Sequence, residues 1–302
     1  MEQTNHAIDF HILDCGIFKR TQTILQEYIA KYPRARIYFH TIPLHDIQDF
    51  QTPLYFSTAI YARFYIAELV PEIEKAIYID IDTYVIGDIA DIFTYNLGEY
   101  GLGAVSGDAD NIFLDQHTFL TKYKDSIGLA KEDYYFISGL LLINCTYWRT
   151  HSVLKQCLDI MKKNKNLSYP DQDALNLLFR QKYTSLPPHF QYFVNETTER
   201  YRTYIEEHIK EKHCVIMHFT THKKPWNTPI EELGFSQTWW KYAKLTPFYT
   251  EFSLELMELQ IKKLVRYNEI TLYKKVKAYL KYKTSWGEQR KKYKQLYHEM
   301  IS

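Results

Sequence analysis

Short apolar runs rich in β-forming residues alternate with helix-forming segments through the first 220 residues. This alternation restricts the fold of the chain more than any other feature, because strands separated by helices are typical of an α/β fold with a largely parallel central sheet. Strands are expected at residues 7–13, 36–42, 76–80, 102–106, 139–144 and 214–219. Helices are expected near residues 19–32, 57–69, 113–124, 147–163 and 171–180.

One of the apolar runs ends in two acidic residues. Residues 76–79 are followed directly by Asp80, Ile81 and Asp82. Alternation along a strand would place the two aspartates on one face and turn Ile81 into the core. Two carboxylates this close repel each other unless a cation lies between them or water screens them, and hard oxygen ligands suit Mg²⁺ or Mn²⁺. By itself the pair fits either a metal site or a solvated strand end.

A second strand end carries a residue that can bind a metal. The run 214–219 contains His218, and Lys223 and Lys224 follow it. Ligands of open α/β sheets bind beyond the carboxyl ends of the strands, so His218 and the two aspartates could share one site. An imidazole favours Mn²⁺ over Mg²⁺, and the lysines could meet a diphosphate as point charges. Taken alone, His218 also fits a core histidine, and Lys224 fits a solvated surface charge.

These strand ends fall within six segments that resemble the family 8 retaining glycosyltransferases, which include bacterial lipooligosaccharide galactosyl- and glucosyltransferases and glycogenin. The segments stand in family order and together cover roughly residues 8–245. They are FHILDCGI (10–17), IYARFYIAEL (60–69), YIDIDTYVIGDI (78–89), FISGLLLINCTYWR (136–149), YPDQDALN (169–176) and HFTTHKKPW (218–226). One short motif would carry little weight, but six in order are specific.

The resemblance implies a GT-A fold and a Mn²⁺-dependent reaction, with Mg²⁺ as the alternative ion. It also implies a UDP-hexose donor, from which galactose or glucose passes to a glycan acceptor such as lipopolysaccharide or lipooligosaccharide. The positions that match the family's site are Asp80, Asp82 and His218 for the metal, Arg63, Asp108, Ser138, Gly139 and Lys224 for the donor, and Asp171 and Gln172 for the reacting sugar. After Pro170, the last two also fit an ordinary helix start.

The chain departs from the family pattern in two places. The family begins with a strand, a base-binding loop and a helix, whereas this chain starts almost at the second strand. A first βα unit of about 30 residues is therefore expected to be missing. The family also usually has an asparagine where this chain has Ile137. An alternative to the active transferase follows, namely a truncated, catalytically weak or inactive remnant that binds a sugar nucleotide or a glycan.

Charge separates the C-terminal segment from the rest of the chain. The net charge is +1, but residues 261–302 contain 12 Lys and Arg against three Glu, a balance of +9, which leaves −8 for residues 1–260. The pattern also becomes helical and Tyr/Lys-rich after Pro247. We therefore predict a GT-A-like catalytic domain at residues 1–250 and a basic helical tail at 251–302. The tail could lie on an anionic membrane surface or pack on the catalytic domain.

Composition and motifs argue against several other classes. No nucleic-acid-binding motif accompanies the basic tail, so a nucleic-acid partner is not expected. No apolar run is long enough to span a membrane, and the first residues do not form a signal peptide. Four scattered cysteines without a CxxC pair indicate free thiols in a reducing compartment. A cytoplasmic protein at the inner membrane face is expected. A glycoside hydrolase with Asp80 and Asp82 as its acid pair is the other enzyme alternative, and it would need neither metal nor nucleotide.

Overall fold

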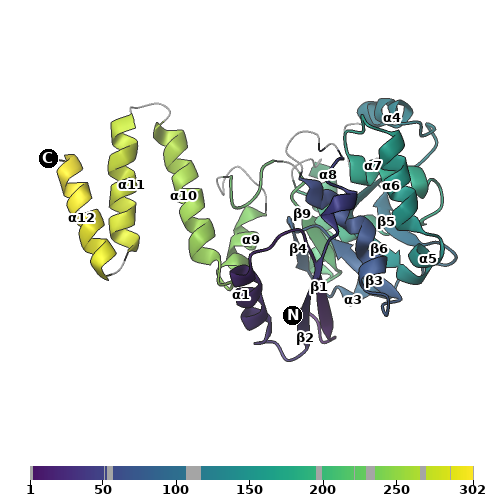
Figure 1. Cartoon of the computed structure of the whole chain (residues 1–302), viewed down its shortest axis with the longest axis horizontal. Helices are drawn as coiled ribbons and strands as arrows, with labels where there is room; N and C mark the ends of the chain where they lie inside the picture. Colours follow the sequence, from purple (N-terminus) through teal and green to yellow (C-terminus); the bar gives the residue numbers. More distant parts are fainter. Residues whose placement is uncertain are drawn as a thin grey trace. The chain divides into compact units, whose positions relative to one another are not determined.

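The structure is a computed structural model that describes residues 3–50, 52, 57–106, 117–194, 199–220, 222–228, 235–265, 270–285 and 287–301 (Figure 1). Contacts divide the chain into two compact units, Met1–His222 and Lys223–Ser302. The predicted division at residue 250 between a catalytic domain and a tail stays a prediction.

The strands of the first unit form three sheets among the described residues. In the first sheet, β1 (Ile8–Asp14) and β2 (Ala35–Thr41) are parallel and are joined through α1 (Lys19–Ile29). The second sheet has the order β3 (Lys75–Ile79), β6 (Phe136–Asn144), β5 (Leu102–Ser106) and β7 (Thr184–Ser185). The third has the order β4 (Thr83–Ile86), β9 (Val215–His218) and β8 (Gln191–Phe193).

The four-stranded sheet is mixed, so the prediction of a mostly parallel central sheet is wrong. β6 runs antiparallel to both of its neighbours, with Leu140 opposite Ile79 of β3 and Leu141 opposite Ala104 of β5. Only β5 and β7 are parallel within this sheet. β6 is buried along almost its whole length. A strand covered on both faces has a continuous apolar sequence whether it runs parallel or antiparallel to its neighbours. The apolar pattern therefore predicts the strand but not its orientation.

The six predicted strands are all present, with ends within three residues of those predicted, whereas the short strands β4, β7 and β8 were not predicted. The predicted helix at 57–69 is a 3₁₀ helix, Thr58–Tyr65, followed by α2 (Ile66–Leu69). The predicted helix at 147–163 is two helices, α5 (Cys145–Thr150) and α6 (Val153–Lys163). Ser152 separates them because its φ of 52° is left-handed.

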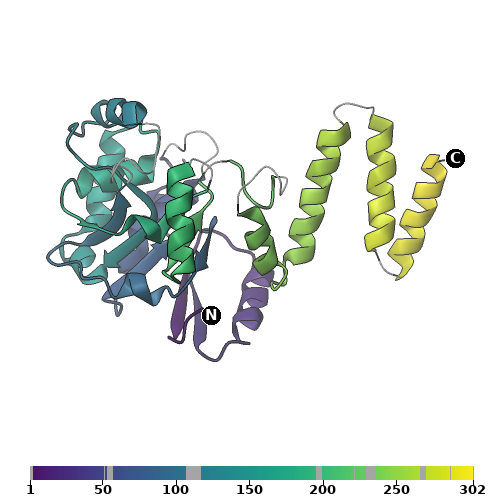
Figure 2. The same cartoon turned by 180° about the vertical axis from the view of Figure 1, so that it is seen from behind.

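The remaining α-helices in the described part of the first unit are α3 (Ala90–Phe93), α4 (His117–Ser126), α7 (Pro170–Leu178) and α8 (Glu199–Lys210). Of these, α4 and α7 were predicted, although residues 113–116 of the predicted fourth helix lie outside the described residues. The helix α8 was not predicted. It contacts β9 and is seen best from behind (Figure 2).

The main core of the first unit lies between the four-stranded sheet and helices α5, α6 and α7. Leu141 and Ile143 contribute to it from β6, Trp148 from α5 and Cys157 from α6. Trp148 is fully buried, and its indole N–H donates a hydrogen bond to the Gly101 carbonyl at 2.9 Å. This packing holds β6 and α7 together, and both elements supply residues to the site described below.

The described part of the second unit is helical. It contains α9 (Ser236–Ala243), α10 (Tyr249–Val265), α11 (Ile270–Thr284) and α12 (Gly287–Ile301). An aromatic cluster around Trp240 joins α9 and α10, and α11 contacts both α10 and α12. None of the helices searched in the described residues has the length and apolar composition needed to cross a bilayer.

Candidate active site

The two acidic residues lie in the turn between β3 and β4. Asp80 donates its backbone N–H to the Gly139 carbonyl at 3.0 Å, and the Asp82 carbonyl accepts from the Phe219 N–H at 3.0 Å. Because β3 ends before Asp80, strand alternation does not apply here. Ile81 is fully exposed, so the prediction that it turns into the core is wrong. The turn, rather than a shared strand face, brings the carboxylates together.

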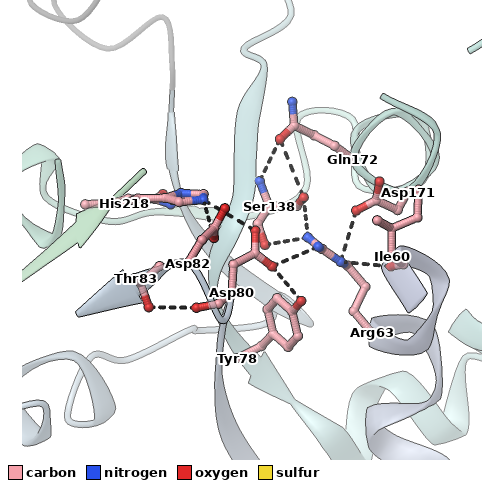
Figure 3. A network of polar contacts seen from close by, with 11 residues as sticks. Ile60, Arg63, Tyr78, Asp80, Asp82, Thr83, Ser138, Asp171, Gln172 and His218 are labelled. Carbon is pink, nitrogen blue, oxygen red and sulfur yellow. Dashed lines mark hydrogen bonds and ion pairs between the residues drawn. The ribbon is translucent and has the colours of Figure 1, made fainter. Parts of the chain in front are cut away.

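His218 at the end of β9 faces both carboxylates (Figure 3). Its Nε2 lies 3.5 Å from Asp80 Oδ2 and 3.2 Å from Asp82 Oδ1. One ligand atom from each of the three residues lies within 4.8 Å of the others. The register of the sheet explains this, since Thr83, directly after Asp82, is paired with His218 across β4 and β9. The predicted convergence of the three side chains is therefore confirmed.

Two neighbours fix the ring of His218. A Cβ at Gly139 would overlap the ring and lie 2.5 Å from its Nδ1, so glycine provides the space that the imidazole occupies. Gln191 of β8 places its amide 2.8 Å from Nδ1. The amide atom at this distance is Nε2, which only donates, so in this orientation Nδ1 accepts and the ring Nε2 carries the proton that faces the aspartates. Rotating the amide by 180° would make Nδ1 the donor and leave the Nε2 lone pair for a metal, as in metal-binding histidines. No spacing or pattern in the sequence points to Gln191.

Arg63 is buried and joins several site residues. Its Nη2 lies 2.9 Å from Asp80 Oδ1, and its Nε lies 3.0 Å from Asp171 Oδ2. Its Nη1 donates to the Ser138 carbonyl at 2.9 Å and to Ser138 Oγ at 2.5 Å. Tyr78 stacks on the guanidinium at 4.7 Å from its ring centroid and donates its hydroxyl to Asp80 Oδ1 at 2.6 Å. Burial alone would lower the pKa of Arg63, but Asp171 and Asp80 raise it above its ordinary value.

Asp171 and Gln172 lie in the first turn of α7, above the guanidinium of Arg63 (Figure 3). Burial raises the pKa of Asp171, and Arg63 acts in the opposite direction. Gln172 Oε1 accepts from the Ser138 N–H at 2.9 Å, and its Nε2 donates to the Tyr135 hydroxyl at 3.0 Å. The structure thus brings together the predicted residues Arg63, Asp80, Asp82, Ser138, Gly139, Asp171, Gln172 and His218.

Two predicted donor-binding residues are not placed in this cluster. Asp108 lies outside the described residues. Lys224 belongs to the second unit, where its N–H donates to Asn227 Oδ1 at 2.8 Å. The roles of both stay predictions. Ile137, which replaces the usual asparagine of the family, packs on an apolar cluster that includes Tyr135.

Asp173 is a further site residue that the sequence does not reveal. It is fully buried and accepts hydrogen bonds from the hydroxyls of Tyr123 and Tyr135 at 2.5 and 2.6 Å. Burial raises the pKa of its carboxyl to about 6. Because Tyr135 also accepts from Gln172, the buried carboxylate fixes the position of Gln172 through that hydroxyl.

The charges and the metal-ligating atoms of this site fit a divalent cation. When ionised, Asp80, Asp82 and Asp171 carry three negative charges, of which Arg63 balances one. The two remaining charges match those of a divalent ion. Two carboxylates and one imidazole suit Mn²⁺ better than Mg²⁺, which prefers oxygen ligands alone.

Comparisons with known proteins agree with this geometry. The model of the family "Glycosyl transferase family 8" matches residues 1–229. A Haemophilus influenzae protein named as a glycosyltransferase is 30% identical over 244 residues, which are 78% of this chain and 68% of that protein. The glycosyltransferase GlyF of Streptococcus pneumoniae is 26% identical over 244 residues, which are 80% of this chain and 55% of GlyF. The chain thus spans only about half the length of some relatives.

The solved structures show the same fold. The galactosyltransferase LgtC, in complex with donor and acceptor sugar analogs, matches with a TM-score of 0.66 and 24% identity over 80% of this chain and 87% of LgtC. The bifunctional glycosyltransferase WbbM matches with a TM-score of 0.67 and 21% identity over 84% of this chain and 47% of WbbM. The predicted α/β fold of the GT-A type is therefore confirmed.

Replacing Gly139 by alanine tests the geometry around His218. We expect Gly139→Ala to weaken Mn²⁺ binding at least about tenfold, as other changes around metal ligands do, because the new methyl group displaces the imidazole. Isothermal titration with Mn²⁺ measures this. Gly98→Ala is the control for a general loss of stability, since its left-handed φ of 60° strains an alanine while a Cβ there meets nothing within 4 Å. Equal Mn²⁺ affinity of Gly139→Ala and the wild type would show that His218 is not a ligand.

The carboxyl of Asp173 predicts a pH dependence of stability. Its pKa of about 6 in the folded chain exceeds the ordinary value of 3.8, so the folded state binds this proton more tightly than the unfolded state. The contribution of Asp173 to the free energy of unfolding should therefore fall by about 2–3 kcal/mol as pH rises from about 4 to 6. In urea denaturation at each pH, the free energy of unfolding of Asp173→Asn should not show this fall. A difference between the two proteins that stays constant with pH would contradict the raised pKa.

Proposed function

The chain belongs to glycosyl transferase family 8, and from this we propose that it is a metal-dependent retaining hexosyltransferase. The donor in this proposal is a UDP-sugar, and galactose or glucose is transferred to a glycan such as lipopolysaccharide or lipooligosaccharide. The convergence of Asp80, Asp82 and His218 beside Arg63 carries the proposal. Family membership disfavours the alternative of a glycoside hydrolase.

The nucleotide half of the donor would bind near the metal ligands. Asp80, Asp82 and His218 would hold Mn²⁺, or Mg²⁺ as the alternative. Such an ion stabilises the negative charge that grows on a departing diphosphate. Lys224 would add a positive charge to the same diphosphate, and Asp108 would contact the donor.

The sugar half of the donor would lie toward α7. All three guanidinium nitrogens of Arg63 already contact Asp80, Asp171 or Ser138. In this proposal, Arg63 therefore holds both carboxylates and the Ser138 backbone in place around the sugar. Gln172 is a poor nucleophile, and its Oε1 already accepts from Ser138. We thus favour attack by the acceptor hydroxyl on the face of the sugar from which the diphosphate leaves.

A second candidate is a binding protein that holds a sugar nucleotide or a glycan without transfer. Ile137 supports it, because an apolar side chain that packs on the cluster around Tyr135 offers the sugar no amide. The following experiment separates the two candidates.

Transfer is tested by incubating the full chain with UDP-galactose or UDP-glucose and a glycan acceptor, with and without Mn²⁺. We expect UDP release that requires the metal. Gln172→Ala should lower turnover at least about tenfold with little change in UDP affinity, whereas Lys224→Ala should weaken UDP binding by about tenfold, or about 1.4 kcal/mol. Lys155→Ala is the matched control, since this exposed lysine pairs with Asp159 on α6.

Two outcomes would contradict the transferase. Metal-dependent UDP binding without transfer from either donor would favour the second candidate. Absence of metal-dependent UDP binding would contradict the transferase and the sugar-nucleotide form of the second candidate, and would leave only glycan binding. If Lys224→Ala binds UDP as tightly as Lys155→Ala does, Lys224 is an ordinary surface charge.

We also propose that residues 251–302 hold the protein on an anionic membrane at the inner face, near a lipid-linked acceptor. Basic residues of α11 and α12 are exposed, among them Lys281, Lys283 and Arg290. All three lie over tyrosine rings, with cation-to-centroid distances between 5.2 and 5.5 Å. Cations mixed with amphipathic rings are typical of segments that bind at a membrane interface.

Reversing three charges of α12 tests the membrane proposal. We expect the full chain to sediment with anionic but not with neutral vesicles, and less so as salt rises. Combined Lys291→Glu, Lys292→Glu and Lys294→Glu should weaken this binding at least about a hundredfold, because each basic residue near an anionic leaflet contributes about 1 kcal/mol. Lys155→Glu, Lys162→Glu and Lys163→Glu on α6 form the matched control. If both triple variants sedimented equally with anionic vesicles, α12 would not be part of the proposed membrane contact.

A further inference from the structure

A second group of metal-ligating side chains lies at the turn between α8 and β9. His208 belongs to the last turn of α8, and Glu211 and His213 follow it. One ligand atom from each of the three lies within 4.8 Å of the others. The side chains of Glu211 and His213 are exposed, so an ion from solution can reach them. This group shares no residue with the active site.

The end of α8 itself brings the two histidines together. His213 donates its backbone N–H to the His208 carbonyl at 3.0 Å, and Lys212 donates to the Ile209 carbonyl at 3.1 Å. These two bonds define a Schellman motif, in which the side chains at the positions of His208 and His213 are in contact and are usually apolar. Here both are imidazoles. Lys212 occupies the position where glycine is usual, with a left-handed φ of 64°.

Hydrogen bonding orients His208 for a metal. Its Nδ1 lies 2.9 Å from the Tyr204 carbonyl. A carbonyl only accepts, so Nδ1 carries the proton and Nε2 presents a lone pair. Metal-binding histidines commonly show this arrangement, with the second nitrogen bound to a backbone carbonyl.

The other two proposed ligands lie close to each other and to His208. His213 Nδ1 lies 3.6 Å from Glu211 Oε2. The ring of His189, from the 3₁₀ helix Pro188–Phe190, stacks on His208 at a centroid distance of 4.4 Å and on His213 at 5.3 Å. Stacking on both rings restricts their rotation. Ion binding would therefore lose less side-chain entropy than it would with freely rotating rings.

We propose that His208, Glu211 and His213 form a second metal site, which takes Zn²⁺ or a similar transition ion. Two imidazoles and one carboxylate suit such ions and leave a position for water. The hard oxygen pair of the active site suits Mn²⁺ instead, so the two sites differ in preference. A bound ion would tie the end of α8 to the residue just before Cys214 and β9. The site does not depend on the proposed transfer reaction.

Zinc competition with a chromophoric chelator tests this site. We use the full chain carrying Asp82→Asn and His218→Gln, so that zinc bound at the active site does not contribute while Asp80 still pairs with Arg63. This protein should bind one Zn²⁺ per chain. Adding His208→Gln and His213→Gln should weaken that binding at least about tenfold. Zinc binding that is absent, or that survives the loss of both histidines, would overturn the proposal.

Two matched variants and a stability measurement complete the test. Lys212→Gly should keep zinc binding, because it relieves the left-handed backbone and leaves all three ligands. His45→Gln should also keep it, since this exposed histidine lies elsewhere, beside Asp46. Zinc at about a hundredfold excess over Kd should raise Tm by about 5 °C in Lys212→Gly but not in His208→Gln/His213→Gln. An equal rise in both would contradict the assigned ligands, and unchanged circular dichroism shows that each variant is folded.

Discussion

The buried guanidinium of Arg63 is the contact on which the rest of the candidate active site depends. It joins the 3₁₀ helix Thr58–Tyr65 to the β3–β4 turn through Asp80, to β6 through Ser138 and to α7 through Asp171. Buried charges are costly unless they are paired, and removing one partner of such a group typically costs about 3–5 kcal/mol. The four elements therefore form a stable arrangement only together. The same pairing allows several acidic groups to gather in one place without a bound ion.

Asp80 shows how this arrangement would prepare the proposed metal site. Its two carboxylate oxygens have separate partners, since Oδ1 contacts Arg63 and the Tyr78 hydroxyl, and Oδ2 faces His218. The direction of the carboxylate is thus set by the protein before any ion binds. On the other side, Gly139 and Gln191 fix the imidazole. Dipoles and charges that are oriented in advance need no reorganisation during a reaction, which is how enzymes stabilise developing charge.

The sequence predicts the parts of this site that have a local signature. Apolar runs indicate the strands, and the rule that ligands bind at strand ends is enough to suggest that Asp80 and His218 meet. Strand alternation fails for Ile81, because it assumes a strand through Asp82, whereas β3 ends three residues earlier, at Ile79, and a turn follows. Strand direction could not be predicted, since a strand buried on both faces has the same pattern in either orientation.

Other parts of the site have no signature in the sequence. Gln191 and Asp173 act on His218 and Gln172 only through contacts between segments far apart in the chain. Their residue types are common, and no spacing marks them. The helix α8 was missed because its sequence is mostly polar and charged, with few apolar residues such as Ile205 and Ile209. The two histidines at and beyond its end become neighbours only when the Schellman turn forms.

β9 physically links the two proposed metal sites within the first unit. It starts just after His213 and Cys214, and it ends at His218, with all four of its residues buried. A strand offers its side chains alternately to opposite faces, so a shift of one residue would turn His218 away from the aspartates. Pairing with β4 and β8 opposes such a shift along the strand. At its start, Gly87 of the neighbouring turn packs so closely on the His213 backbone that a Cβ would lie 2.7 Å from the carbonyl oxygen. The turn after α8 therefore sets where β9 begins, and through a short, rigid strand it sets where His218 stands.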